Sequence, residues 1–200
     1  MKKILSIIIS AILIITLFSG CGGKEASIDF IYPFDANVNS YDPQVASTSD
    51  EFLIIENTFE GLIRINDDGT VVPGMSDKWE ISDDGLTYKF HIREGMKWDI
   101  NTEKYTSGEN KGKFKDSRLQ MLGYEFNPDI TANDFVFALR RAAYYVTDCP
   151  QFSLISCIKN ANRIHTGAVL PTELGVVAND DYNLTITLEH RDDTFMQTLA

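Results

Sequence analysis

Four pairs of adjacent aspartates come nearest, by type and spacing, to a catalytic group of residues in this chain. The pairs are Asp67-Asp68, Asp83-Asp84, Asp180-Asp181 and Asp192-Asp193. Two neighbouring carboxyl groups can divide the roles of acid and base in a hydrolysis. Three of the four pairs, however, lie in or beside turn signals, where Asp is favoured because its side chain bonds the local backbone. We therefore expect turns at these positions, and no carboxylate dyad.

Patterns for a nucleophile, a metal or a phosphate are also missing from the sequence. His91, His165 and His190 stand apart, and neither His-Glu-x-x-His nor Cys-x-x-Cys spacing occurs, so zinc is not predicted. No serine lies in a Gly-x-Ser-x-Gly elbow, and no phosphate-cradling glycine loop is present. The sequence predicts a protein that is not an enzyme and uses no metal and no cofactor. An extracytoplasmic hydrolase is the alternative that these patterns disfavour most.

The first residues predict export from the cytoplasm. A short positive start, Met1-Lys2-Lys3, precedes an almost unbroken apolar run from Ile4 to Phe18, which is typical of a secretory signal over residues 1–20. This run is short for a membrane-spanning helix and ends sharply. A helix that remains in place as an N-terminal anchor is the alternative.

The end of that signal resembles the lipobox of bacterial lipoproteins. Small residues, Ser19-Gly20, precede Cys21, although Phe18 stands where Leu is usual. The resemblance implies cleavage before Cys21, a lipid on that cysteine, and an extracytoplasmic protein anchored to the cell membrane. Residues 21–27 read as a flexible polar tether. An ordinary signal with a chance cysteine is the competing interpretation.

The composition and charge limit the possible partners. With 44% hydrophobic and 24% charged residues, the chain has the composition of a soluble globular protein. Removing residues 1–20 takes away two of the 18 basic residues, which leaves 16 against 29 acidic residues and a net charge of −13. Such a charge argues against nucleic acid or anionic lipid as a partner of the body. Cys149 and Cys157 form either a local disulfide or two free thiols.

The stretch from Trp79 to Trp98 predicts a β-hairpin. From Leu86 to Arg93 the residues alternate between an apolar face (Leu86, Tyr88, Phe90, Ile92) and a polar face (Thr87, Lys89, His91, Arg93). A period of two is typical of a half-buried strand. Asp83-Asp84-Gly85 supplies the turn before it. His91 therefore falls on the polar face, where we expect it to be solvated or paired at the surface.

Other elements follow from local patterns. Ser47-Thr-Ser-Asp50 has capping-box spacing and predicts a helix that carries Phe52, Ile55 and Phe59 and ends at Gly61. Thr131 predicts the start of a second helix. Its apolar stripe is Phe135, Ala138, Leu139 and Ala142. Strands are expected at Ser27–Tyr32, 62–65, 71–74, 175–178 and 184–188, a long surface loop or β-excursion at 99–127, and a helix beginning within 192–200.

The order of several motifs identifies a family resemblance. The motifs are Tyr41-Asp42-Pro43, Phe59-Glu60-Gly61-Leu62, Asp68-Gly69, Val72-Pro73-Gly74, the block from Lys78 to Arg93, Lys97-Trp98, Thr131-Ala132-Asn133-Asp134-Phe135 and Leu174-Gly175-Val176. Together they closely resemble the N-terminal part of family 5 extracellular solute-binding proteins, the oligopeptide, dipeptide and nickel binders of ABC importers. The resemblance implies a mixed α/β, type II periplasmic-binding-protein-like fold, in which two lobes close over a ligand.

That resemblance also implies a division of this chain. Residues 28–65 and 161–200 would belong to lobe one, and residues 66–160 to an inserted extra domain. Full members of the family are much longer, so we expect this chain to be an incomplete form that lacks the second lobe. On that basis the 200 residues alone are expected to show no measurable ligand binding.

The ligand site implied by the resemblance lies just after the Asp-Pro motif. Oligopeptide binders hold an extended peptide largely through its backbone, as an added strand. Ala46, Ser47, Thr48 and Ser49 are the candidates for that contact. In the alternative interpretation, Ser47 and Ser49 only cap the helix that follows. The implied partners are an oligopeptide, the permease subunits of the importer, and the membrane through the lipid anchor, with no nucleic acid.

Two departures from the family pattern leave other functions open. Residues 99–130 stand where relatives have a handful of residues, and Met75-Ser76 replaces the usual Leu-Ala. The first departure affects loop geometry and ligand specificity. The alternatives are a family member for another solute (a nickel complex, haem, a sugar or a pheromone peptide) and a surface lipoprotein that acts as an adhesin or sensor without transport.

Overall fold

The computed structural model of the chain describes residues 38–121 and 126–200. The predicted signal, the tether, the strand expected at Ser27–Tyr32 and the lipidation site Cys21 lie outside these residues. Within the two described ranges, no helix has both the length and the apolar character that crossing a membrane requires.

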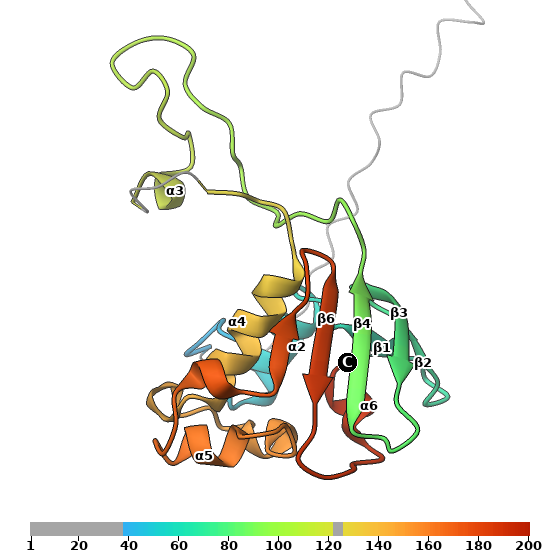
Figure 1. Cartoon of the computed structure of the whole chain (residues 1–200). Helices are drawn as coiled ribbons and strands as arrows, with labels where there is room; N and C mark the ends of the chain where they lie inside the picture. The colour runs from blue at the N-terminus through green and yellow to red at the C-terminus, as the bar shows by residue number, and fades with distance from the viewer. Residues whose placement is uncertain (1–37, 122–125) are drawn as a thin grey trace, which may run out of the picture. The chain divides into compact units, whose positions relative to one another are not determined.

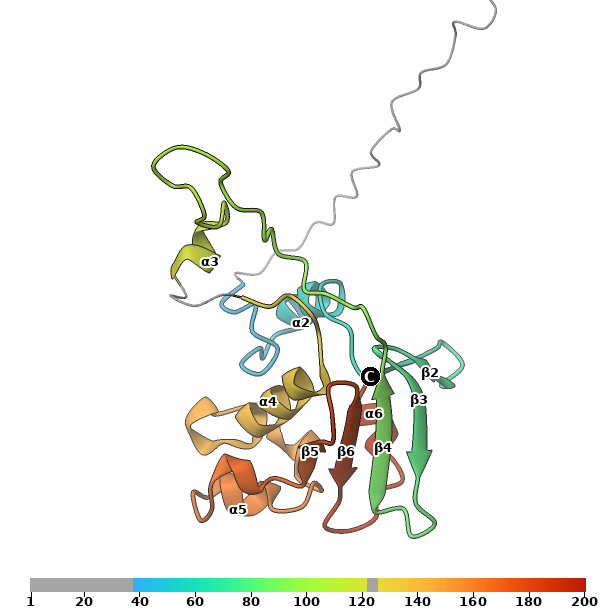
Figure 2. The same cartoon turned by 45° about the horizontal axis from the view of Figure 1, so that its top comes forward.

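The main sheet of the described residues has four antiparallel strands. Its strands are β3 (Ser76–Ile81), β4 (Thr87–Ile92), β5 (Val176–Ala178) and β6 (Asn183–Thr187). They lie in the order β3-β4-β6-β5, as Figures 1 and 2 show. The pairing of β4 with β6 joins two strands that are far apart in the sequence. The architecture is mixed α/β, as expected.

The predicted hairpin is confirmed as β3 and β4. Gly85 adopts a φ of +69°, which L-residues with a side chain rarely adopt, and so permits the turn. The apolar face of β4 is buried, with Phe90 1% exposed, while Lys89 on the other face is exposed. Trp79 pairs with Phe90 across the hairpin and packs against the core. The alternation therefore predicted both the strand and its buried side.

Helices cover the apolar face of the sheet. They are α4 (Ala132–Ala143), α5 (Ala161–His165) and α6 (Phe195–Thr198), with the short 3₁₀ turns η1 (Tyr145–Thr147), η2 (Phe152–Ile155) and η3 (Pro171–Glu173). The rings of Tyr88 on β4 and Phe195 on α6 meet edge to face with centroids 5.0 Å apart. Leu184, Ile186 and Leu188 are buried in the same cluster, which confirms the expected strand.

The buried face of α4 differs from the predicted stripe. The structure buries Ala132, Val136 and Ala143, while Phe135 is only partly buried. The fully buried line begins at Ala132 and runs beside the predicted stripe, of which Phe135, Leu139 and Ala142 are partly buried against the same core. The predicted stripe therefore lies at the edge of the contact between α4 and the core.

A second, two-stranded sheet consists of β1 (Ile63–Ile65) and β2 (Val71–Pro73), as expected.

The helix before this small sheet is shorter than predicted. It was expected to end at Gly61, and this is wrong, because α2 (Ser49–Glu56) ends with Asn57 as its cap. Gly61 is instead a site of close backbone approach. A Cβ on Gly61 would lie 2.7 Å from the carbonyl oxygen of Leu199, so the missing side chain leaves room for the backbone.

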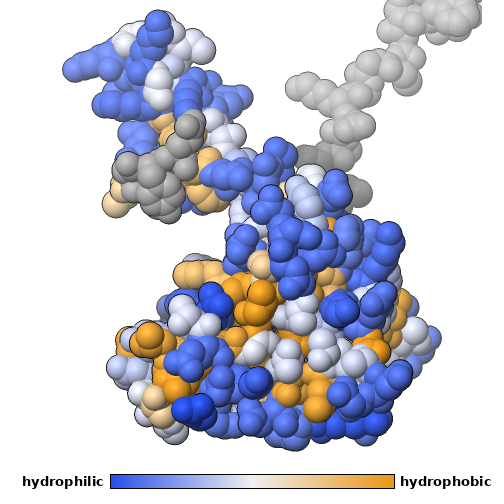
Figure 3. Space-filling view, in the orientation of Figure 1, coloured by the Kyte–Doolittle hydropathy of each residue, from blue (hydrophilic) through white to orange (hydrophobic). Residues whose placement is uncertain are grey.

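The long polar segment after the hairpin leaves the main sheet and takes part in two isolated β-bridges. Lys97 pairs with Asp129 and Lys104 with Phe114 in isolated β-bridges. It also contains a short helix that was not expected, α3 (Ser117–Met121), in which Leu119 is buried. Most of the other described side chains of this segment are exposed and polar, in agreement with the predicted surface loop or β-excursion (Figure 3).

The main sheet crosses the boundary drawn after residue 160. Strands β3 and β4 come from the segment 66–160, and β5 and β6 come from 161–200. All the described residues belong to one compact unit. The assignment of these segments to lobe one or to an inserted domain stays a prediction.

Candidate functional site

The loop before α2 folds around one buried carboxylate, that of Glu51. Glu51 is 1% exposed. Its Oε1 accepts the backbone N–H groups of Asn39 and Ser40 at 2.9 and 3.1 Å. Its Oε2 accepts those of Ser47 and Thr48 at 2.8 and 3.1 Å. One side chain therefore ties together both ends of the segment from residue 39 to residue 48.

These four donors keep Glu51 ionised. The N–H of Ser47 contributes most to lowering the pKa of Glu51 to about 2, and the N–H groups of Thr48, Asn39 and Ser40 add to it. Burial acts in the opposite direction, because it disfavours the charged form. A carboxylate that accepts several N–H bonds is better stabilised than its protonated form. The loop is thus organised around a fixed negative charge.

The helix cap lies one residue later than predicted. Thr48 is the N-cap of α2, and its Oγ1 accepts the N–H of Glu51 at 3.3 Å while Glu51 bonds back to the Thr48 N–H. The box predicted from Ser47 to Asp50 is therefore wrong. Glu reaches back to the cap better than Asp, because its side chain is one methylene longer. Neither Ser47 nor Ser49 is the cap residue.

The four predicted contact residues lie together at the start of α2, but they differ in exposure. Ala46 is fully buried, so its side chain faces the protein interior. Thr48 is half-buried and its hydroxyl is used for the cap. Ser47 and Ser49 are exposed. Direct contact of a ligand with these side chains is thus a prediction for Ser47 and Ser49, with Ala46 and Thr48 supporting them.

An ion pair attaches the same loop to α4. The guanidinium nitrogens of Arg141 lie 2.9 and 2.5 Å from the two carboxylate oxygens of Asp42. Arg141 also donates to Gln44 Oε1 at 2.8 Å, and Gln44 Nε2 donates to the carbonyl of Ala138 at 2.7 Å. The bond from Arg141 is the main cause that lowers the pKa of Asp42. Asp42 of the Asp-Pro motif is therefore held in place by α4.

The site predicted from the sequence includes neither Glu51 nor Arg141. The Glu51 signal is present, because Thr48-x-x-Glu51 is a better capping box than Ser47-x-x-Asp50. No local signal identifies Arg141, since its partner Asp42 is 99 positions away in the sequence.

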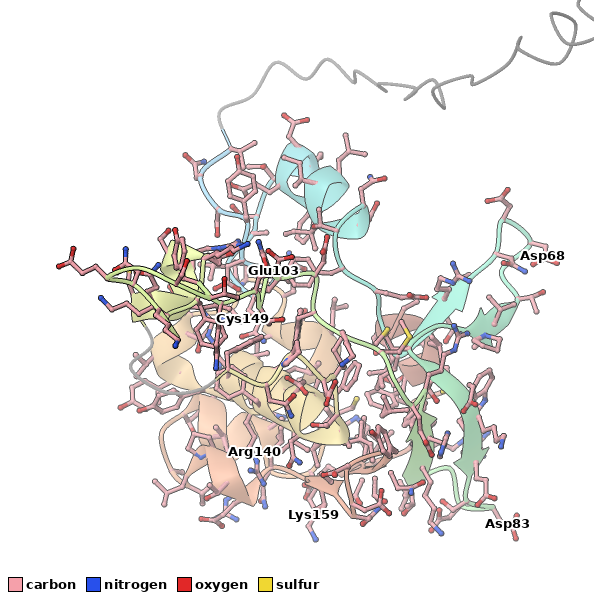
Figure 4. All side chains as sticks on the ribbon, turned by 90° about the horizontal axis from the view of Figure 1, so that it is seen from above. Asp68, Asp83, Glu103, Arg140, Cys149 and Lys159 are labelled. Carbon is pink, nitrogen blue, oxygen red and sulfur yellow. The ribbon has the colours of Figure 1, made fainter. Side chains whose placement is uncertain are left out.

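The aspartate pairs are turns, as predicted. In each pair one member accepts a backbone N–H two residues further on: Asp68 from Thr70, Asp84 from Leu86, Asp180 from Tyr182 and Asp192 from Thr194. Asp68 and Asp83 lie at the tips of separate turns in Figure 4. The surface-paired interpretation of His91 is confirmed by its 2.7 Å contact with Asp77. The described ranges hold no group of three side chains suited to a metal.

The two cysteines of the described body are free thiols. Cys149 and Cys157 are both buried and form no disulfide in the structure, which decides between the two alternatives. Burial raises the pKa of Cys157 to about 11, and the nearby Asp192 adds to the effect. Burial also raises the pKa of Cys149. At neutral pH neither is a thiolate nucleophile.

Residues 46–49 line neither of two hollows that lie on the described surface. One, of about 390 Å³, lies against α4 and is lined by Asn133, Val136, Phe137, Arg140, Arg141, Tyr144 and Pro171. Arg140 projects from α4 in Figure 4, and its Nη2 lies 3.3 Å from the carbonyl of Thr172. The other, of about 610 Å³, lies over the polar face of the main sheet. Arg141 connects the first hollow to the loop through Asp42.

The chain is similar in sequence to bacterial proteins that are named as binding proteins. The chain is 31% identical over 173 residues to a protein of Escherichia coli named as the probable deoxycholate-binding periplasmic protein YgiS, with 86% of this chain and 28% of that protein covered. It is 29% identical to the oligopeptide-binding protein OppA of Bacillus subtilis over 212 aligned residues, with 100% of this chain and 34% of that protein covered. The chain thus spans about a third or less of the length of these relatives.

A solved structure and a family model point to the same kind of protein as these relatives. The structure of Listeria monocytogenes OppA bound to peptide superposes with a TM-score of 0.64 at 27% identity, covering 84% of this chain and 28% of that one. The model of the bacterial extracellular solute-binding proteins, family 5 (middle), matches residues 70–200, which is more than half of the chain. The chain belongs to the family 5 bacterial extracellular solute-binding proteins.

Proposed function

We propose that the protein containing these residues is the solute-binding component of an ABC importer, and that its solute is an oligopeptide. The observation that carries the proposal is the family membership together with a relative, OppA of Bacillus subtilis, that aligns with the whole of this chain. The preformed loop at the start of α2 supports it, because a loop that is fixed before binding loses less conformational freedom when a ligand binds.

In this proposal the described residues supply one side of the binding site. Ser47 and Ser49 contact the peptide, while Glu51 and the Asp42–Arg141 pair hold the loop. The relatives are about three times as long or longer, so the other side of the cleft comes from residues beyond this chain. Binding by these 200 residues alone is accordingly expected to be too weak to measure.

The proposed setting is outside the cytoplasm, with a lipid on Cys21 as the membrane anchor and the importer's permease as the partner. The sequence supports the anchor through the apolar run before Cys21 and the small residues Ser19 and Gly20. The protein acts by capturing and delivering a solute, and no catalytic step belongs to this role. Mass spectrometry of the protein from the membrane fraction tests the anchor: an unmodified Cys21 in secreted protein would contradict it.

A different solute is the second candidate, and the name of one relative favours it. YgiS of Escherichia coli is named for deoxycholate, an amphipathic carboxylate rather than a peptide. The two candidates predict different bound ligands in protein that is purified in its folded state from its own cells. Mass spectrometry of the released ligand should show short peptides of mixed sequence. A single non-peptide compound would replace the peptide proposal by this second one.

A further inference from the structure

Four consecutive backbone donors in the candidate loop point inward. The N–H groups of Val45 and Ala46 bond the carbonyl of Asp42 at 3.1 and 3.0 Å. Those of Ser47 and Thr48 bond the Glu51 carboxylate. A strand normally offers a neighbouring chain alternating donors and acceptors. Along residues 45–48 the donors are already occupied inside the protein.

Helix capping alone does not explain the position of Glu51. A capping box requires the glutamate to accept only the N–H of the cap residue, here Thr48. Glu51 accepts three more, from Asn39, Ser40 and Ser47. Two carboxylate oxygens can accept four such bonds, whereas a Gln amide would turn its NH₂ group toward one of the two pairs of donors.

We propose that Glu51 is a positioning residue that fixes the loop with its N–H groups inward, so that the polar groups left for a ligand along this loop are the carbonyl oxygens of Val45, Ala46 and Ser47 and the Ser47 hydroxyl, because the Thr48 carbonyl accepts the Phe52 N–H. The ligand groups recognised there are therefore N–H donors, namely backbone amides or an ammonium group. This inference rests on the proposed function for the nature of the ligand, but the positioning role of Glu51 does not depend on it.

Amide hydrogen exchange of this chain tests the positioning role directly. The amides of Asn39, Ser40, Ser47 and Thr48 should be protected in the unmodified chain. In Glu51→Gln, one pair should exchange faster by about tenfold, because each lost hydrogen bond to a charged acceptor removes local protection. The core amide of Phe90 should be unchanged. Glu56→Gln, an exposed substitution on the same helix, is the matched control and should leave all four amides protected.

The outcomes separate a local role from a general loss of stability. Unchanged exchange of the four amides in Glu51→Gln would overturn the proposal. Equal acceleration of the four amides and of Phe90 would also overturn it, since that describes global unfolding. If Glu51→Gln does not fold, Glu51→Asp keeps the charge but is one methylene shorter, and it should accelerate the same amides. Protection of the four amides in Glu51→Asp equal to that of the unmodified chain would contradict the proposal.

N-methylated peptides test the donor requirement in the protein as the cell makes it. Replacing one backbone N–H of a bound peptide by N-methyl, position by position, should weaken binding about tenfold or more at the residue beside the loop. Equal affinity of every N-methylated peptide would overturn the donor requirement. If no peptide binds while the exchange result holds, the proposed function fails and the positioning role of Glu51 stands.

Discussion

Arg141 and Asp42 form a two-point ion pair between segments 99 positions apart in the sequence. The pair joins the loop that carries the candidate contact residues to the C-terminal half of α4, which itself packs against the core of the main sheet. Planar two-point pairing fixes orientation as well as distance. The position of the loop is therefore tied to the core and not only to α2.

A double-mutant cycle should detect this coupling. Asp42→Asn and Arg141→Met each remove one partner, and urea unfolding of the single and double variants gives the interaction. We expect about 1 kcal/mol, the upper part of the range for partly exposed pairs, because the geometry is two-point. The exposed pair of Glu60 and Arg64, at 3.4 Å, is the control and should give only a few tenths of a kcal/mol. Equal coupling in both cycles would contradict the anchoring role.

Glu51 should make stability depend on pH in acid. Its pKa is about 2 in the folded chain against an ordinary value of 4.5. A group whose pKa is lowered by folding contributes stability that is fully present above the unfolded pKa and is lost as the pH falls through the folded value. The stability difference between the unmodified chain and Glu51→Gln should therefore be largest above about pH 5 and shrink toward pH 2. A difference that is constant over this range would show that the charge of Glu51 does not matter.

The two faces of β4 should respond differently to truncation. Phe90 is 1% exposed, and Phe90→Ala should cost about 3–5 kcal/mol through lost burial and the cavity left behind. Lys89 is its neighbour on the exposed face, so Lys89→Ala should change stability by about 0.5 kcal/mol or less. Chemical unfolding measures both. Similar losses for the two variants would contradict the register of the strand.

Thiol titration should distinguish the three cysteines. Cys149 and Cys157 are buried, and the raised pKa of Cys157 keeps it protonated at pH 8, so a disulfide reagent should label the native body slowly. After unfolding, two thiols should react if Cys21 carries its lipid through sulfur, and all three cysteines if it does not. Rapid labelling of two thiols in the native protein would contradict the burial.

The parts of the fold that the sequence predicted are those set by short-range rules. The β4 alternation and the turn at Gly85 are local, because strand period and positive φ are properties of a few residues. The helix after Thr131 was also predicted, but its buried face was predicted only in part, because the fully buried residues lie beside the predicted stripe. Which side of an amphipathic helix is covered depends on the elements that pack against it, and for α4 these include β5, far along the chain.

The candidate site shows the same limit. Residues 46–49 were identified as a group through the resemblance to the family, but their exposure depends on contacts that the sequence pattern does not contain. Thr48 and Glu51 form a readable capping box, and yet the bonds from Glu51 to Asn39 and Ser40 come from a loop with no regular period. Arg141 could be placed on a helix, but its partner could not be identified without the fold.

The most direct test of the proposed function is calorimetric titration of the protein, in the form its own cells produce, with mixed tri- to pentapeptides. We expect saturable heat with one peptide bound per protein, and weaker binding after Glu51→Gln but not after Glu56→Gln. The absence of any heat at high micromolar peptide would contradict the proposal that this family 5 protein captures oligopeptides.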